Sequence, residues 1–458
     1  MVNVITELSR YAMILMLALY TLQGFRLVNL QDEEKEAALW QQNILFFALH
    51  FLGNGILYLN TQNEKILYFY GAQVAAFVVF LVLQHLLYPR ADKLLNHNLL
   101  MLLSIGLLML ARLSFDKAER QLEVAILAMG LTFLIPLIIR KAGKLRELYW
   151  LYGAVGFLLL AAVLILGSLS YGAKLAITIH GVTFQPSELV KILFVFFAAG
   201  MLHKQPDFRR VVVTTAAAAA FVLVLVLSKD LGGALIYFVT YLMILYVATG
   251  QPLYLLGGLL AGSGASFIAY RLFSHVQTRV LAWRDPFSVI EKEGYQVTQS
   301  LFAIGTGGWF GSGLGKGMPY KIPVVEQDFI FSAIAEELGV LFAVFLIFVY
   351  ICCFYMIINI AACLKDTYYK LVALGLGVLL IFQVFLSVGG AMKFIPSTGV
   401  TLPFISYGGS SLLTTFMIWA IIQGMYLKRG DEVAENDRKE DKDDKSKDEK
   451  AKTKKAKQ

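Results

Sequence analysis

The stretch "DFIFSAIAEELGVLFAVFLIFVYICCFYMI" (328–357) decides the fold class. It opens with Asp328, carries two further carboxylates at Glu336 and Glu337, and then continues without a charge to its end. A helix needs about 20 mostly apolar residues to cross the hydrocarbon core of a bilayer. We therefore expect residues 329–357 to form a membrane-spanning helix. Carboxylates are costly at membrane depth, so each acid here needs a partner or a chemical role.

The rest of the chain repeats this pattern. Of its 458 residues, 58% are hydrophobic and 16% are charged, whereas ordinary soluble domains are about half apolar and about a quarter charged. We expect an all-α polytopic integral membrane protein with about 13 transmembrane helices. The expected spans are residues 10–30, 40–59, 66–88, 98–114, 121–140, 147–170, 188–203, 210–228, 231–249, 253–271, 329–357, 371–392 and 408–427.

Short basic loops predict the orientation of these spans. The stretches 89–93, 140–147 and 204–210 fall on one side in a count of thirteen spans, and an excess of Lys and Arg marks the cytoplasmic side. The carboxyl terminus falls on the same side. The amino terminus and the long loop 272–328 then face outward.

The carboxyl-terminal segment 428–458 is almost wholly polar and mixes both charges. With so few apolar residues to bury, it is expected to be a disordered, solvated cytoplasmic tail. A contact of its basic end with anionic lipid is the alternative.

Cysteines and histidines predict no further site. Cys352, Cys353 and Cys363 imply no disulfide framework. The six histidines lack metal-ligand spacing. "GLGKGM" lacks the hydroxyl residue of a nucleotide-binding P-loop, which disfavours an ATP-driven pump. No nucleic-acid partner is expected.

The long loop contains "GYQVTQSLFAIGTGGWFGSGLGKG" (294–317), which is rich in glycine. Such a run allows tight turns and lets backbone N–H groups surround an anion, although a flexible loop would have the same composition. Tyr295, Phe302, Trp309 and Phe310 favour a segment that folds back onto the membrane surface.

Five motifs in order resemble the SEDS family (shape, elongation, division and sporulation), whose members include RodA and FtsW. The resemblance covers about residues 98–427, which hold ten of the expected spans. The motifs are "FQPSELVK" (184–191), "DLGGA" (230–234), the glycine-containing stretch 294–317, "DFIFSAIAEELG" (328–339) and "IPSTGVTLPFISYGGSS" (395–411).

The resemblance implies a peptidoglycan glycosyltransferase. Such an enzyme polymerises lipid II into glycan strands at the outer face of the bacterial cytoplasmic membrane, during elongation, division or sporulation. The resemblance also implies a class B penicillin-binding protein as partner. No transpeptidase motif is recognisable in this chain, so cross-linking would have to come from such a partner. A lipid-linked precursor flippase and a non-catalytic scaffold for a cell-wall synthase are the alternatives.

By position, Asp328 matches the essential carboxylate of this family. A pyrophosphate leaves a sugar without being protonated, so the reaction needs one base for the acceptor hydroxyl and cations for the phosphates. An outer membrane boundary suits that base. A helix cap is the structural alternative for an Asp at this position.

The chain departs from the family just before Asp328. Many members read Pro-Glu-x-His-Thr-Asp, and here the Glu and His positions are Val324 and Glu326. Glu326 lies close enough in sequence to raise the pKa of Asp328, or to hold a divalent cation together with it. No cofactor is otherwise implied.

Five more residues are candidate substrate contacts. Glu188 and Lys191 are three apart and can pair along one helix face, or line the substrate cavity. Lys393 has no acid near it in sequence, which suits either a pyrophosphate contact or a side chain that extends to the membrane interface. Ser406 and Ser410 bring hydroxyls for phosphate, or small residues for helix packing.

Residues 1–97 hold three spans and carry none of the five motifs. We expect this amino-terminal module to dock laterally on the catalytic bundle and to serve partner binding or stability, not chemistry.

Overall fold

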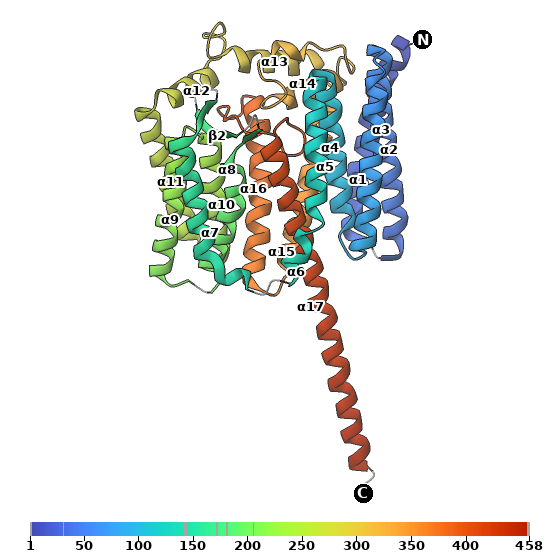
Figure 1. The fold of residues 1–458 in the computed structure, drawn as a ribbon, viewed down its shortest axis with the longest axis vertical. Helices are drawn as coiled ribbons and strands as arrows, with labels where there is room; N and C mark the ends of the chain where they lie inside the picture. Colours follow the sequence, from blue (N-terminus) through green and yellow to red (C-terminus); the bar gives the residue numbers. More distant parts are fainter. Residues whose placement is uncertain are drawn as a thin grey trace.

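The computed structural model describes residues 2–30, 32–141, 144–170, 173–179, 182–204 and 206–455. It is a bundle of long, roughly parallel helices with short elements across one end (Figure 1). The helices are α1 (Val2–Asn29), α2 (Asp32–Thr61), α3 (Lys65–Leu87), α4 (Lys93–Leu113), α5 (Phe115–Thr132), α6 (Ile135–Lys141), η1 (Leu145–Leu148), α7 (Tyr149–Leu166), α8 (Pro186–Leu202), α9 (Phe208–Leu227), α10 (Leu231–Thr249), α11 (Pro252–Leu272), α12 (Ser274–Arg284), α13 (Tyr295–Gly307), η2 (Pro319–Lys321), α14 (Ile330–Leu338), α15 (Val340–Cys363), α16 (Thr367–Ala391) and α17 (Gly409–Lys455).

Twelve helices in the described part of the chain are long and apolar enough to cross a membrane. The remaining expected span, 188–203, corresponds to α8, which has 17 residues and is buried along nearly its whole length. The prediction of a polytopic α-helical membrane protein is confirmed. The amino terminus lies at the same end as α12 and α13, and α17 leaves from the opposite end (Figure 1).

The span expected at 329–357 is wrong as a single helix. The chain breaks at Gly339, whose φ of 93° is left-handed, so the crossing helix is α15 and α14 is a separate short helix. A Cβ at this glycine would lie 2.5 Å from Gly311 N. The backbone there also binds the loop after α13, because Val340 N donates to Gly308 O at 2.9 Å.

The span expected at 147–170 is also too long. α7 ends at Leu166, and three short strands follow it: β1 (Ser168–Ser170), β2 (Ala173–Ile179) and β3 (Val182–Phe184). They pair antiparallel in the order β1-β2-β3. The β-branched residues of "AITI" and "VTF" favour strands. The end of α7 at Leu166 could not be predicted, because the uncharged sequence continues past it.

The carboxyl-terminal segment differs from the expected disordered tail. α17 continues as one helix to Lys455 and projects away from the bundle (Figure 1). Glu, Lys and Ala are good helix formers, and Pro and Gly are missing after Gly430. Residues 456–458 lie outside the described part.

The amino-terminal helices α1, α2 and α3 pack along one side of the bundle (Figure 1), mainly against α4 and α15. Tyr20 OH donates to Asn98 Oδ1 at 2.9 Å, and Gln42 Oε1 lies 3.2 Å from His97 Nδ1. α4 is therefore an interior helix. It begins at Lys93 instead of residue 98 because the Asp92 side chain caps it, accepting from Leu95 N.

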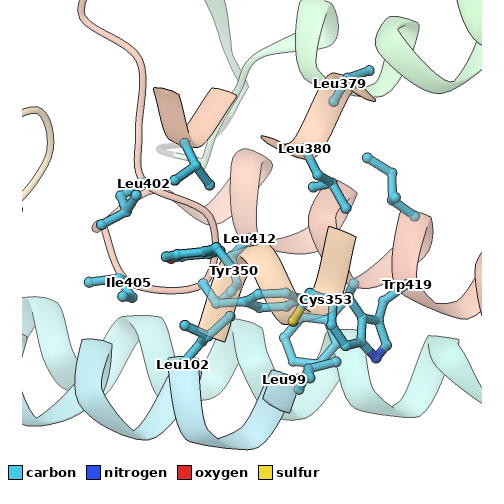
Figure 2. Close-up of a cluster of buried hydrophobic side chains, with 14 of the residues drawn as sticks. Leu99, Leu102, Tyr350, Cys353, Leu379, Leu380, Leu402, Ile405, Leu412 and Trp419 are labelled. Atoms are coloured by element: carbon cyan, nitrogen blue, oxygen red, sulfur yellow. The ribbon is translucent and has the colours of Figure 1, made fainter. Parts of the chain in front are cut away.

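The core lies where α4, α15, α16 and α17 meet (Figure 2). Tyr350 and Trp419 are buried there beside Leu102 and Leu402. The Tyr350 hydroxyl donates to Pro403 O at 2.5 Å, which fixes the connection between α16 and α17 to this core. That connection, residues 392–408, is called the return loop below.

Gly106 in α4 provides a test of this packing. A Cβ there would lie 2.6 Å from Phe404 O and 2.7 Å from Ile405 Cα, so Gly106→Ala must displace the return loop. Overpacking of this kind costs about 1–3 kcal/mol. We expect a lower thermal midpoint in detergent. Gly55→Ala, where a Cβ meets nothing within 4 Å, should not lower it, and equal midpoints for the two variants would contradict the packing described.

Candidate active site

Residues 326–328 are fastened to the return loop by two contacts. Ser406 Oγ donates to Gln327 O at 2.5 Å and accepts from Leu402 N at 2.9 Å. The next backbone amide, Tyr407 N, donates to Glu326 O at 2.8 Å. The segment just before α14 is thus held from one side by a side-chain hydroxyl and a backbone amide of the return loop.

Asp328 lies in the turn that leads into α14, and its side chain is only partly exposed. It does not cap α14, because the N-cap position is Phe329 and no side-chain cap bond is formed. Its carboxylate instead faces the return loop: a methyl group on Gly399 would lie 3.6 Å from Asp328 Oδ2. The helix-cap alternative is therefore wrong.

The Arg279 side chain, which comes from α12, extends to Gly399 of the return loop as the Asp328 carboxylate does. The same methyl group on Gly399 would lie 4.0 Å from Arg279 Nη2, and Arg279 Nη1 donates to Ser397 O at 3.0 Å. One helical turn later, Trp283 Nε1 donates to Lys393 O at 3.1 Å. These two contacts dock α12 on the return loop. The guanidinium of Arg279 lies beside the Asp328 carboxylate.

The charges of this cluster alter one another's proton affinity. Burial raises the pKa of Asp328 to about 6, and the attraction of Arg279 only partly offsets this. Burial also lowers the pKa of Arg279, opposed by Asp328 and then by Asp230. Both carboxylates therefore act electrostatically on Arg279. Asp230 itself caps α10, because Asp230 Oδ1 accepts from Gly233 N at 2.8 Å.

Glu188 and Lys191 form the expected local pair, with Lys191 Nζ 2.7 Å from Glu188 Oε1. The pair is buried, and it also connects to the return loop: Lys191 Nζ donates to Gln383 Oε1 at 3.2 Å, and Gln383 Nε2 donates to Thr401 O at 3.0 Å. The local pair is therefore present, and a role in lining the substrate cavity stays a prediction.

The remaining candidates divide into two groups. The hydroxyls of both serines are used within the protein, Ser406 as described and Ser410 by accepting from Gln185 N at 3.0 Å. Both hydroxyls therefore have partners inside the protein, and a phosphate contact by either serine stays a prediction. Lys393 is different, because it lies at the start of the return loop and no hydrogen bond or ion pair of its ammonium is found among the described residues.

Glu326 does not turn toward Asp328 as a second metal ligand would. Its carboxylate forms an ion pair with Lys117 of α5, while Asp328 lies beside Arg279. Each carboxylate therefore already faces a cation, and no group of three His, Cys, Asp or Glu side chains suited to a metal occurs in the described ranges. The donors present do not fit a divalent cation.

Glu336 and Glu337 on α14 are buried, and their carboxylates accept hydrogen bonds from the backbone of residues 315–318. Gly315 N donates to Glu337 Oε2 and Met318 N donates to Glu336 Oε1. Arg112 of α4 completes this contact, with Nη2 3.1 Å from Glu337 Oε1. Backbone donors and one guanidinium offset part of the cost of burying two acids, although Glu336 Oε2 is buried without a hydrogen-bond partner among the described residues.

Sequence reasoning missed Arg279 and Lys117. Both lie far in sequence from the residues that they serve, so spacing gave no signal. Only Arg279 could have been suspected from the sequence, because it is a basic residue of the long loop 272–328 and the departing phosphate needs a cation beside it.

The fold and the site define a polytopic membrane protein with a charged site at one end of its bundle. A family model described as Cell cycle protein, FTSW_RODA_SPOVE, matches residues 92–429. The chain belongs to this family.

Named relatives and solved structures agree with this assignment. The peptidoglycan glycosyltransferase RodA of Mycobacterium tuberculosis is 33% identical over 363 residues, covering 73% of this chain and 77% of the relative. The probable peptidoglycan glycosyltransferase FtsW of Saccharophagus degradans is 33% identical over 360 residues, covering 73% and 92%.

Among solved structures, a chain from work on "Structural coordination of polymerization and crosslinking by a peptidoglycan synthase complex" has a TM-score of 0.63 at 26% identity, covering 74% of this chain and 98% of that chain. RodA of Thermus thermophilus has a TM-score of 0.55 at 26% identity, covering 74% and 97%.

The Ser406 contact gives a prediction on stability. Ser406→Ala leaves Leu402 N and Gln327 O without their partner, and an unsatisfied buried group costs about 1–3 kcal/mol. We expect a lower thermal midpoint in detergent. Ser288→Ala is the control, because that hydroxyl donates to Asp285 O at the exposed surface. An unchanged midpoint for Ser406→Ala would show that the hydroxyl does not hold the two segments together.

Proposed function

We propose that this chain polymerises lipid II into glycan strands and that Asp328 is the general base. The chain is a peptidoglycan glycosyltransferase, as its named relatives are. The single observation that carries the base assignment is a partly buried carboxylate, free of any capping role, that lies beside a guanidinium at one end of a membrane bundle.

The chemistry needs one proton acceptor. A hydroxyl of the acceptor sugar attacks the anomeric carbon of the donor: the new bond joins that oxygen to the carbon, and the bond to the pyrophosphate breaks. Asp328 takes the hydroxyl proton as the oxygen attacks. The departing pyrophosphate takes the electron pair of the broken bond and spreads its negative charge over the phosphate oxygens, so no acid is required to protonate it.

The leaving group needs positive charge. Arg279 lies beside Asp328, and a planar guanidinium matches phosphate oxygens with two parallel donors. Lys393 is the second candidate, because its ammonium extends from the same loop that Arg279 binds. These cations would stabilise charge that grows in the transition state, which is where such stabilisation raises the rate.

The proton affinity of the site supports this role. A base works best when its pKa lies near the working pH, and burial raises the pKa of Asp328 to about 6. At neutral pH the carboxylate is still ionised, yet it is more basic than an ordinary aspartate.

Orientation and partner belong to the same proposal. Arg140 and Lys141 end α6, which lies at the end of the bundle opposite α13 (Figure 1); this supports a cytoplasmic position for that end and an outward position for Asp328. A class B penicillin-binding protein would cross-link the strands, and a similar chain belongs to a complex described by its polymerization and crosslinking. The predicted localisation is the bacterial cytoplasmic membrane.

The first functional prediction concerns Asp328→Asn. The amide keeps the shape but cannot accept the proton, so purified protein in detergent should form no polymer from labelled lipid II. Because ionised Asp328 is disfavoured by burial, the variant should keep or raise its thermal midpoint at pH 7.5. Asp285→Asn is the matched control, an exposed acid of the same long loop. Polymer formation by Asp328→Asn at the control's rate would refute the base assignment.

The assay also separates a polymerase from a flippase. Detergent micelles have no two leaflets, so flipping has no meaning there. Polymer formed by the wild-type chain in detergent would therefore show that the chain is a transferase.

The second prediction concerns pH. The pKa of Asp328 is raised from 3.8 to about 6, so the active, ionised form is present above that value and is lost as the pH falls through it. We expect kcat/KM for polymerisation to decline about tenfold per pH unit well below 6. A profile that stays flat down to pH 4.5 would mean that another group accepts the proton.

A further inference from the structure

The amino-terminal module touches the end of the bundle that carries the site. Its contacts fall on the glycine-rich loop, defined here as residues 308–318. Arg10 Nη1 of α1 donates to Gly311 O at 2.7 Å, and Asn60 Nδ2 of α2 donates to Leu314 O at 2.8 Å. Two helices of the module thus bind two backbone carbonyls of one loop.

Neighbouring groups hold both donors in place. Glu7 Oε2 lies 2.9 Å from Arg10 Nη2, and Thr6 Oγ1 donates to Asn60 Oδ1 at 3.2 Å. The amide oxygen of Asn60 is therefore engaged, which turns its NH₂ group toward the loop. The Tyr11 ring packs on Phe310 with centroids 5.2 Å apart. The module presents a fixed surface to this loop.

The loop needs such support because its backbone is unusually free. Gly308, Gly311, Gly313 and Gly315 all have positive φ, and glycine loses more conformational entropy on ordering than any other residue. Each hydrogen bond from a rigid neighbour offsets part of that cost.

On its other side the same loop holds α14. Ser312 N donates to Glu336 O at 2.8 Å, and Gly313 N donates to Glu337 O at 2.9 Å. These bonds complement the side-chain contacts of both glutamates described above. All nine residues of α14 are buried, and the helix begins two residues after Asp328. A shift of the loop would therefore move the helix to which Asp328 is attached.

We propose that Arg10 and Asn60 are positioning residues of the transferase: they clamp the glycine-rich loop, and through α14 they set the place of Asp328. The inference rests on the proposed function. Both residues lie outside the segment matched by the family model, which begins at residue 92. The clamp is thus a contribution of the extra module to the site, in addition to any role in stability.

The test compares the double variant Arg10→Ala/Asn60→Ala with a matched pair, Arg26→Ala/Gln41→Ala. In the control pair, Arg26 pairs with Glu34 and Gln41 with Gln23, both inside the module. A misplacement of about 1 Å at a catalytic group costs up to about 100-fold in rate. We expect the clamp variant to lose about 10- to 100-fold in kcat with KM within about twofold, and the control pair to match the wild type.

Two further measurements keep the outcome interpretable. Hydrogen–deuterium exchange at residues 308–318 should be faster in the clamp variant and unchanged in the control pair. Arg10→Lys, which keeps a charged donor, should recover part of the kcat lost in Arg10→Ala. A wild-type kcat and exchange in the clamp variant would overturn the proposal, and so would a loss shared equally by the control pair, which would indicate general destabilisation.

The exchange measurement needs no substrate. If the wild-type chain forms no polymer, the proposed function fails, while faster loop exchange in the clamp variant still supports the clamp and unchanged exchange still refutes it.

Discussion

The attachment of residues 326–328 to the return loop is the constraint on which the site depends. The Ser406 hydroxyl and the Tyr407 amide bind two consecutive carbonyls, those of Gln327 and Glu326. The return loop is in turn bound by Arg279 from α12 and by Gln383 from α16. Elements that lie far apart in the chain therefore meet at one irregular segment, and Asp328 takes its place from all of them.

Irregular backbone near a membrane must find partners inside the protein. The structure meets this demand with side chains that act as donors and acceptors for loops. Tyr350 binds the carbonyl of Pro403, and Glu336 and Glu337 accept from amides of the glycine-rich loop. The two buried acids that stood out in the sequence are thus structural, whereas Asp328, the acid at the boundary, is the one without such a task.

The sequence predicted what depends on local pattern. Long apolar runs located the spans, and the spacing of Glu188 and Lys191 predicted their pair. It could not predict contacts set by tertiary structure. Arg279 beside Asp328 and Lys117 beside Glu326 join distant segments, so no spacing rule finds them. The break at Gly339 was not predicted within the span expected at 329–357, because the close approach of Gly311, a tertiary contact, is what requires a glycine there.

The central claim is that the fold makes Asp328 a base that is ionised yet unusually basic. Infrared difference spectroscopy of the carboxyl band, titrated in the wild-type chain and in Asp328→Asn, measures this directly. The account predicts a band that is missing in the variant and titrates with a midpoint of about 6. A midpoint at the ordinary value of 3.8 would contradict it.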